Sequence, residues 1–204
     1  MRRAASLLCA VMTICGCSRE LVWQPYADAS GDFSVEAPKS WPSTHDPNLK
    51  RRPVAMVTFL GEETPQDEGR PLGAQIQVSR VTRVASEMPA DAKARRKFVE
   101  AWIVPPDVLF GAPVESLPPE ARENLPKVSD TTLGGKAAKT YEREYEYVNH
   151  AHGALDVWIR SVDVVVRTDK AYYMVVYSAP RDRFEKYRPV FERFVKSFAF
   201  GPSA

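Results

Sequence analysis

The C-terminal third of the chain restricts the fold more than any other segment, because two long apolar runs there are separated by only three turn residues. Residues 157–167 and 172–177 are apolar on both faces over most of their length, which is typical of strands inside a sheet that is covered on both sides. The turn Thr168-Asp169-Lys170 is too short for a crossover helix, so the strands must be antiparallel. We therefore expect an antiparallel hairpin at the centre of a sheet.

The pattern changes to that of a helix over residues 182–198. Its aromatic side chains recur at spacings of three and four on one face, namely Phe184, Tyr187, Phe191, Phe194 and Phe198. Such a stripe predicts an amphipathic helix whose aromatic face belongs to the core. Pro189 lies inside this pattern, where it is expected to kink the helix or to mark the first turn of its main segment.

Alternating side chains predict further strands. Residues 22–26 and 32–38 alternate around a turn at 28–31, and residues 54–59 form a nearly continuous apolar run. In residues 141–147 tyrosines alternate with glutamates, which predicts a strand with one solvent-exposed face.

Two segments in the middle of the chain depart from simple alternation. Residues 74–78 alternate with period two, whereas Val81 and Val84 fall out of step, which predicts a twist or bulge in that strand. Residues 91–102 carry apolar side chains at intervals of four and predict an amphipathic helix that ends before Pro105-Pro106.

Residues 104–127 contain six of the 17 prolines and one expected helical turn at 120–124. A long irregular segment in a compact domain is often functional. Prolines preset the backbone and lower the cost of presenting Val108, Leu109, Phe110 and Leu117 to a partner. The same side chains could instead cover one edge of the core, and the sequence leaves both interpretations open.

The beginning of the chain resembles a bacterial lipoprotein signal. Met1-Arg2-Arg3 precedes a short apolar run that ends in Ile14-Cys15-Gly16-Cys17, which resembles the lipobox. The run is shorter than the roughly 20 apolar residues of a membrane-spanning helix. The resemblance implies a cleaved signal peptide over residues 1–16, lipid on Cys17, a tether over 17–20 and a single domain over 21–204. Because Ser18 follows the cysteine, the sorting rule implied by the resemblance favours the outer membrane in a cell with two membranes.

The composition argues against disulfides, cysteine metal sites and nucleic-acid binding in this domain. All three cysteines lie in the first 17 residues, so neither a disulfide nor a cysteine metal site is expected after processing. Of the 28 basic residues, Arg2 and Arg3 leave with the signal, and the remaining 26 balance 26 acidic ones. A neutral domain without a basic block gives no support for nucleic-acid binding.

The order of these elements resembles the PsbP-like superfamily, whose fold also occurs in the Ran-binding Mog family and in bacterial envelope lipoproteins. The motifs that carry the resemblance are Trp23…Tyr26…Gly31-Asp32-Phe33, Leu133-Gly134-Gly135-Lys136-Ala137 and Tyr177-Ser178-Ala179-Pro180…Tyr187-Arg188-Pro189…Ser197-Phe198. The resemblance implies an α+β fold in which an antiparallel sheet is sandwiched between helices. Members of such families mostly bind or stabilise other proteins, so the resemblance also implies a non-enzymatic role.

Few residues suggest catalysis or metal binding. His150 and His152 flank one alanine and could hold zinc or copper, but a hairpin tip is also where solvated polar residues are expected. No Gly-x-Ser-x-Gly motif or phosphate-binding glycine motif is present. We expect no enzyme activity, no cofactor and no specific metal site.

Two charges interrupt the apolar strand at 157–167. Arg160 and Asp163 are interpreted as charges at an open end of the sheet, as cross-strand pairs with Arg143 or Lys139, or as part of a polar cluster that lines a cleft. The neighbouring tyrosines are expected to pack across strands, although an exposed aromatic patch for a partner is the alternative.

The sequence therefore predicts a membrane-anchored envelope lipoprotein that binds or stabilises another envelope protein. The alternative function is binding of a small apolar ligand or lipid in a cleft between sheet and helix.

Overall fold

The computed structural model describes residues 20–45, 54–62, 73–82, 104–117, 119–123, 125–148, 156–202 and 204. Cys17, the helix expected at 91–102, His150 and His152 lie outside these residues. The strands are β1 (Trp23–Ala27), β2 (Phe33–Pro38), β3 (Ser43–His45), β4 (Val54–Leu60), β5 (Gln75–Thr82), β6 (Ser129–Leu133), β7 (Lys136–Val148), β8 (Asp156–Arg167), β9 (Ala171–Pro180) and β10 (Ala199–Phe200). The helices are α3 (Pro106–Leu109), the 3-10 turn η2 (Val114–Ser116), α4 (Pro119–Arg122) and α5 (Phe184–Ser197).

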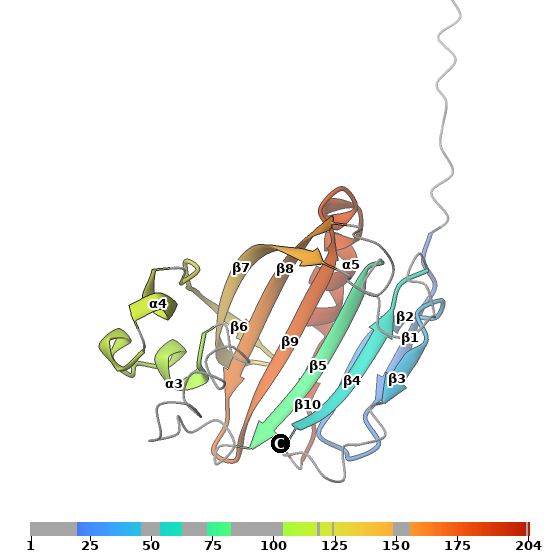
Figure 1. Cartoon of the computed structure of the whole chain (residues 1–204). Helices are drawn as coiled ribbons and strands as arrows, with labels where there is room; N and C mark the ends of the chain where they lie inside the picture. Colours follow the sequence, from blue (N-terminus) through green and yellow to red (C-terminus); the bar gives the residue numbers. More distant parts are fainter. Residues whose placement is uncertain are drawn as a thin grey trace, which may run out of the picture.

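Seven strands form one antiparallel sheet in the order β3-β4-β5-β9-β8-β7-β6, and β1, β2 and β10 form a second, smaller sheet (Figure 1). The β8–β9 hairpin lies in the middle of the larger sheet, which confirms the arrangement predicted from its apolar runs. Both strands need apolar side chains on both faces, because the sheet is covered on both sides.

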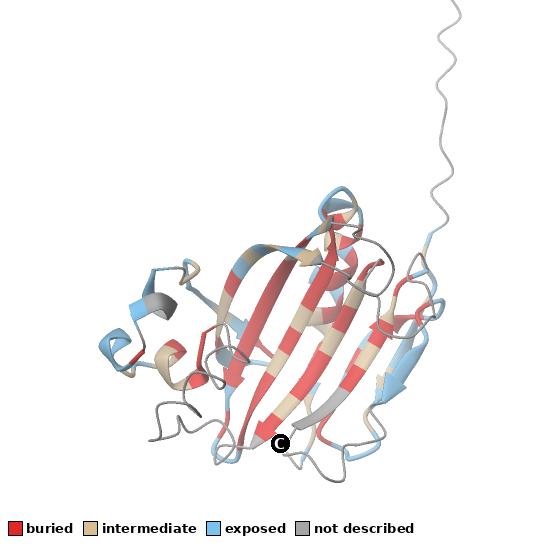
Figure 2. Cartoon of the chain, in the orientation of Figure 1, coloured by how far each residue is buried: buried red, intermediate tan, exposed pale blue. Residues whose placement is uncertain are grey.

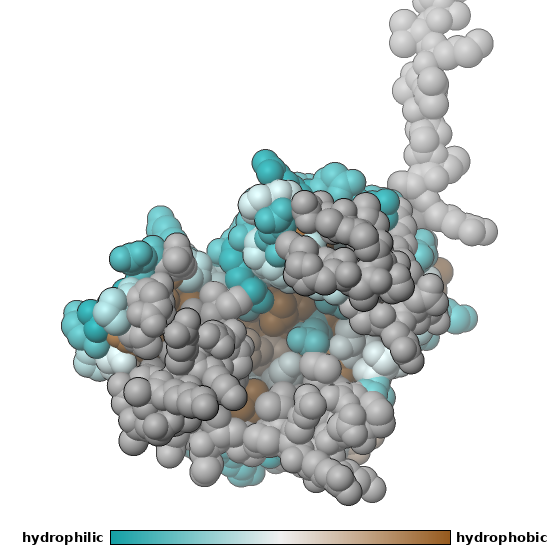
Figure 3. Space-filling view, in the orientation of Figure 1, coloured by the Kyte–Doolittle hydropathy of each residue, from teal (hydrophilic) through white to brown (hydrophobic). Residues whose placement is uncertain are grey.

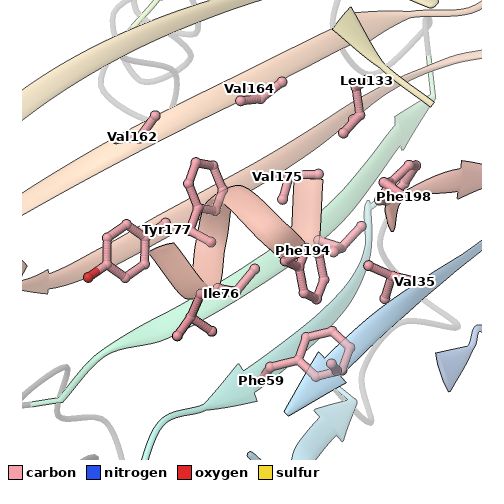
Figure 4. Packing of buried hydrophobic residues seen from close by; sticks show 14 of the residues in the cluster. Val35, Phe59, Ile76, Leu133, Val162, Val164, Val175, Tyr177, Phe194 and Phe198 are labelled. Atoms are coloured by element: carbon pink, nitrogen blue, oxygen red, sulfur yellow. The ribbon is translucent and has the colours of Figure 1, made fainter. Parts of the chain in front are cut away.

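Helix α5 packs against β9 of the larger sheet and β2 of the smaller one, so it covers the first face of the larger sheet. The five predicted aromatic side chains are all buried. The ring of Phe194 lies 5.2 Å from that of Phe59 between centroids (Figure 4). The ring of Phe191 lies 5.4 Å from that of Tyr177. Burying one such ring stabilises the fold by about 1.5–3 kcal/mol. The helix continues through Pro189 to Ser197.

The side of the larger sheet opposite to α5 is called here the second face. Val81 breaks the alternation of β5 because its side chain is buried on this face. Strand β5 pairs continuously with both β4 and β9 from Gln75 to Thr82, so the predicted bulge is wrong over these residues. Val81 is buried and lies opposite Tyr172 on the second face, whereas Ile76 and Val78 contribute to the first core. The alternation changes because the second face of β5 is also buried toward the end of the strand, at Ser79 and Val81, whereas Gln75 and Gln77 are only partly buried. Figure 2 shows β5 as a strand of buried and partly buried residues.

The segment between β5 and β6 supplies cover for the second face. Val104 and Leu109 form a buried cluster with Tyr141, Val165 and Tyr172. The fold is therefore α+β, an antiparallel sheet with helical segments on both faces, as predicted.

Residues 104–127 contain more regular structure than the single turn expected at 120–124. Three short helical turns are present, and α3 and α4 begin at Pro106 and Pro119. Proline is favoured at the first position of a helix, because its missing N–H would have no partner there. The prolines of this segment thus begin helical turns, an effect that the sequence analysis did not predict.

Candidate binding face

A buried polar cluster lies within the second face, next to the apolar cluster under α3. Figure 3 looks onto this face and shows hydrophobic side chains over the middle of the sheet. The polar cluster comes from β7 and β8, where Tyr141 pairs with Asp163 and Arg143 pairs with Ser161 in the strand register.

Asp163 is the centre of this cluster. Asp163 is only 1% exposed. Ser161 Oγ donates a hydrogen bond to Asp163 Oδ1 at 3.2 Å, Arg143 Nε lies 3.6 Å from the same oxygen, and the Tyr141 hydroxyl also donates to the carboxylate. The ion pair with Arg143 confirms one of the alternatives predicted for Asp163.

The surroundings shift the pKa values of Asp163 and Tyr141. Burial raises the pKa of Asp163, while Arg143 and the hydrogen bonds from Tyr141 and Ser161 act in the opposite direction. Burial and the adjacent carboxylate raise the pKa of the Tyr141 phenol, so this hydroxyl stays protonated and donates. The carboxylate is therefore surrounded by donors from the protein itself, which suits a binding or structural role better than proton transfer.

Arg143 connects this cluster to the outer part of the face. Its guanidinium lies 4.9 Å from the centre of the Tyr145 ring, and its buried Nε makes no hydrogen bond within the described part of the chain. The side chain is 24% exposed. It can therefore still offer donors to an acceptor at the surface.

The four residues predicted for partner binding divide into two pairs. Leu109 and Leu117 are buried, whereas Val108 and Phe110 are half-buried. The hydroxyl of Tyr172 donates a hydrogen bond to Asp107 Oδ1 at 2.8 Å, and the Phe110 ring lies 5.9 Å from the Tyr172 ring. The segment thus covers the core with one pair and exposes part of the other, so docking by all four together stays a prediction.

Arg160 belongs to a different network from Asp163. It donates to Glu142 at 2.7 Å and to Glu185 on α5 at 2.9 Å, on the side of the sheet that faces the helix. Tyr141, Tyr172 and Tyr173 are buried, which favours cross-strand packing over an exposed aromatic patch for these three residues.

One cavity was missed by the sequence analysis. It has a volume of about 190 Å³ and lies under the β1–β2 turn, where Asp32 forms an ion pair with Arg80 at 3.4 Å beside Tyr173. Asp32 follows a glycine turn and Arg80 lies on an alternating strand. Nothing in the sequence around either residue predicts this ion pair.

No group of three or more His, Cys, Asp and Glu side chains among the described residues is placed to hold a metal ion. No helix in the described ranges is long and apolar enough to cross a membrane.

No protein-family model matches the chain, and no curated protein matches its sequence. Several solved structures are similar to it. Cyanobacterial PsbP from Synechocystis is 14% identical with a TM-score of 0.48, and the match covers 93% of this chain and 98% of that protein. The Ran-binding protein Mog1p of Saccharomyces cerevisiae is 12% identical with a TM-score of 0.40, over 87% of this chain and 95% of that protein.

A crystal structure from Bacteroides thetaiotaomicron is 10% identical with a TM-score of 0.48 over 87% of this chain. This chain spans about half of that protein, since the match covers 48% of it. PsbP and Mog1p represent the two groups named from the sequence motifs. At these identities and TM-scores the neighbours carry no conclusion about function.

Proposed function

We propose that this chain is a membrane-tethered, non-enzymatic protein of the cell envelope that binds or stabilises another envelope protein through its second face. One observation carries the proposal: α3 is held against β9 while Val108 and Phe110 keep part of their surface exposed.

The fixed backbone of this segment favours binding. Leu109 is buried, Asp107 accepts a hydrogen bond from Tyr172, and Arg122 Nε donates to the carbonyl oxygen of Leu117 at 2.8 Å. A partner would therefore meet Phe110 in an ordered conformation, so that little conformational entropy would be lost on binding. Aromatic side chains held in this way are typical of residues that dominate binding energy.

The tether is the second part of the proposal. Lipid on Cys17 would hold the domain at the membrane surface, since two or three acyl chains anchor stably where one does not. Ser18 after the cysteine favours the outer membrane in a cell with two membranes.

The experiment is an affinity pull-down of the acylated protein, crosslinked in its own membrane, with wild type and Phe110→Ala side by side. We expect Phe110→Ala to lose a specific crosslinked protein while its urea midpoint stays close to that of wild type. Val114→Ala is the matched control, because Val114 is an exposed apolar residue on the same segment. A lowered midpoint with full capture would show that Phe110 serves the core and would overturn docking at this segment.

A second function is favoured by a groove between α5 and strands β6–β8. It has a volume of about 510 Å³ and is lined by Val162, Val164, Phe191, Val195, Thr131 and Thr140, among others. Apolar side chains with a few hydroxyl groups suit a small apolar ligand or a lipid chain. Native mass spectrometry of protein released gently from membranes tests this function, and a bound mass that Val164→Trp removes would support it.

A further inference from the structure

The cavity under the β1–β2 turn has both charged and apolar walls. Two register pairs of the larger sheet line it, since Val57 on β4 lies opposite Val78 on β5 and Arg80 on β5 lies opposite Tyr173 on β9. Asp32 lines it from the β1–β2 turn. Val57 and Val78 belong to the core of the first face, whereas α3 covers the second face. The cavity is therefore separate from the surface of the proposed function, and a ligand in it is independent of docking at α3.

The size of the cavity limits its ligand to a small molecule. Its volume is about 190 Å³, and an apolar cavity of about 150 Å³ is large enough to bind benzene. Ala29, Ser30 and His45 also line the cavity and are exposed, so a ligand can enter from the surface. The space therefore suits a molecule with one short chain or one small ring.

Hydrogen bonds hold the turn above the cavity in one conformation. The N–H of Asp28 donates to the carbonyl oxygen of Phe33 at 2.9 Å. The N–H of Gly201 donates to the carbonyl oxygen of Asp32 at 2.8 Å. Ser30 donates to the Asp28 carboxylate through both its N–H and its hydroxyl, so Asp28 serves the turn itself. A site fixed in this way loses little conformational entropy when a ligand binds.

Three polar groups of the cavity lack good partners among the described residues. The Asp32 side chain is 6% exposed, and Arg80 Nη1 lies 3.4 Å from its Oδ2, which is longer than a strong hydrogen bond. Arg80 Nε is buried and has no hydrogen-bond partner within the described ranges. Tyr173 is buried, and its hydroxyl makes no hydrogen bond to a described residue. Buried polar groups without partners cost free energy, so a ligand that supplies the partners gains affinity.

The Tyr173 hydroxyl lies close to both charges of the cavity. Burial raises the pKa of Tyr173, Asp32 raises it further, and Arg80 acts in the opposite direction. The cavity therefore presents two donors, Arg80 Nε and the Tyr173 hydroxyl, beside the carboxylate of Asp32. A ligand with only a negative charge would lie beside Asp32, and a ligand with only a positive charge would leave the Arg80 donor without an acceptor. A zwitterion provides a partner for all three groups.

We propose that this cavity binds a free α-amino acid with a small apolar side chain. The ammonium group of the ligand pairs with Asp32, and its carboxylate accepts hydrogen bonds from Arg80 Nε and the Tyr173 hydroxyl. Its side chain packs on Val57 and Val78, where each buried methylene adds to the affinity. The two charges of an α-amino acid are carried on one carbon, which matches the closely spaced carboxylate and guanidinium of the cavity.

The test is a calorimetric titration of the full chain, purified from its membrane and dialysed, with L-leucine. Three further probes each lack one feature of leucine: isoamylamine lacks the carboxylate, 4-methylpentanoate lacks the ammonium group, and glycine lacks the apolar side chain. We expect L-leucine to bind. Each of the other three should bind about tenfold more weakly or less, because a charge-assisted bond or the apolar contact is lost.

Two conservative substitutions test the contacts while the buried carboxylate stays in place. Tyr173→Phe removes only the hydroxyl and should weaken L-leucine binding about three- to tenfold. Arg80→Lys keeps the charge but removes Nε, and should weaken binding about tenfold. Thermal unfolding without ligand shows that each variant is folded. Glu192→Gln is the control, since it removes an exposed carboxylate on α5, outside the cavity, and should leave the affinity unchanged.

Three results would overturn the inference. The first is no binding of L-leucine at millimolar concentration. The second is binding of isoamylamine or 4-methylpentanoate as tight as that of L-leucine, because the ligand would then not be a zwitterion. The third is wild-type affinity in the folded Tyr173→Phe and Arg80→Lys variants, which would place the ligand elsewhere. The pull-down with Phe110→Ala is independent of all three, since Phe110 packs on the second face.

Discussion

Tyr141 on β7 lies directly opposite Asp163 on β8, and its hydroxyl donates a hydrogen bond to the Asp163 carboxylate within the second face of the sheet. Both residues are buried. A buried carboxylate is tolerated only when it is hydrogen-bonded or paired with a charge, and Ser161 adds a second hydrogen bond while Arg143 forms an ion pair.

The first prediction follows from the raised pKa of Asp163. Because its pKa in the folded state lies above the ordinary value, the folded protein binds this proton more tightly than the unfolded chain. This contribution to stability is fully present below the ordinary pKa of an aspartate and is lost as the pH rises through the raised pKa. We expect wild type to gain stability relative to Asp163→Asn as the pH falls from 7 to 4, measured by urea unfolding. Asp169→Asn in the exposed β8–β9 turn is the control, and a difference that shrinks toward low pH would contradict the direction.

The second prediction concerns the aromatic face of α5. Phe191→Ala removes a buried ring that stacks on Tyr177 and should cost about 3–5 kcal/mol of unfolding free energy. The adjacent Glu192 is exposed, so Glu192→Ala should change stability by less than about 0.5 kcal/mol. Equal urea midpoints for the two variants would show that α5 is not packed through this face.

The third prediction compares two adjacent glycines in the β6–β7 turn. Gly134 and Gly135 both have positive φ, 54° and 76°. A Cβ on Gly134 would lie 2.7 Å from the Phe200 ring, whereas a Cβ on Gly135 would meet nothing within 4 Å. Gly135→Ala should therefore cost about 1–2 kcal/mol for backbone strain alone. Gly134→Ala should cost about 1–3 kcal/mol more, because Phe200 must move. Thermal unfolding of both variants measures the difference, and an equal loss would remove the proposed contact with Phe200.

The fourth prediction tests the anchor. Cys17→Ser should leave a precursor that no longer incorporates radioactive fatty acid, because the thioether needs the cysteine sulfur. Cys15→Ser is the matched control and should still be labelled. Equal labelling of wild type and Cys17→Ser would exclude lipid on this residue.

The local pattern of apolar residues was sufficient to predict the elements in which that pattern is clear. The hairpin β8–β9 was predicted because both its strands are apolar on both faces, and α5 because its aromatic residues recur every three or four positions. Local patterns failed at Val81, where a change of alternation was interpreted as a twist or bulge, although the strand pairs continuously and Ser79 and Val81 are buried on its second face. They also underestimated residues 104–127, because a proline that interrupts one helix can begin another.

The sequence by itself determined the class of fold, the central strands and the aromatic helix, because side-chain periodicity is a local property that reports which face of an element is buried. Only the tertiary structure decided which side chains meet. Asp163 contacts Tyr141 and Arg143 because of the β7–β8 register, Phe110 stays half-exposed because α3 packs on Tyr172, and β7 extends beyond its pairing with β6 because β6 is the shorter strand. These relationships join residues that are distant in the chain, and register, strand length and packing across the sheet set them, none of which is encoded in the period of a single segment.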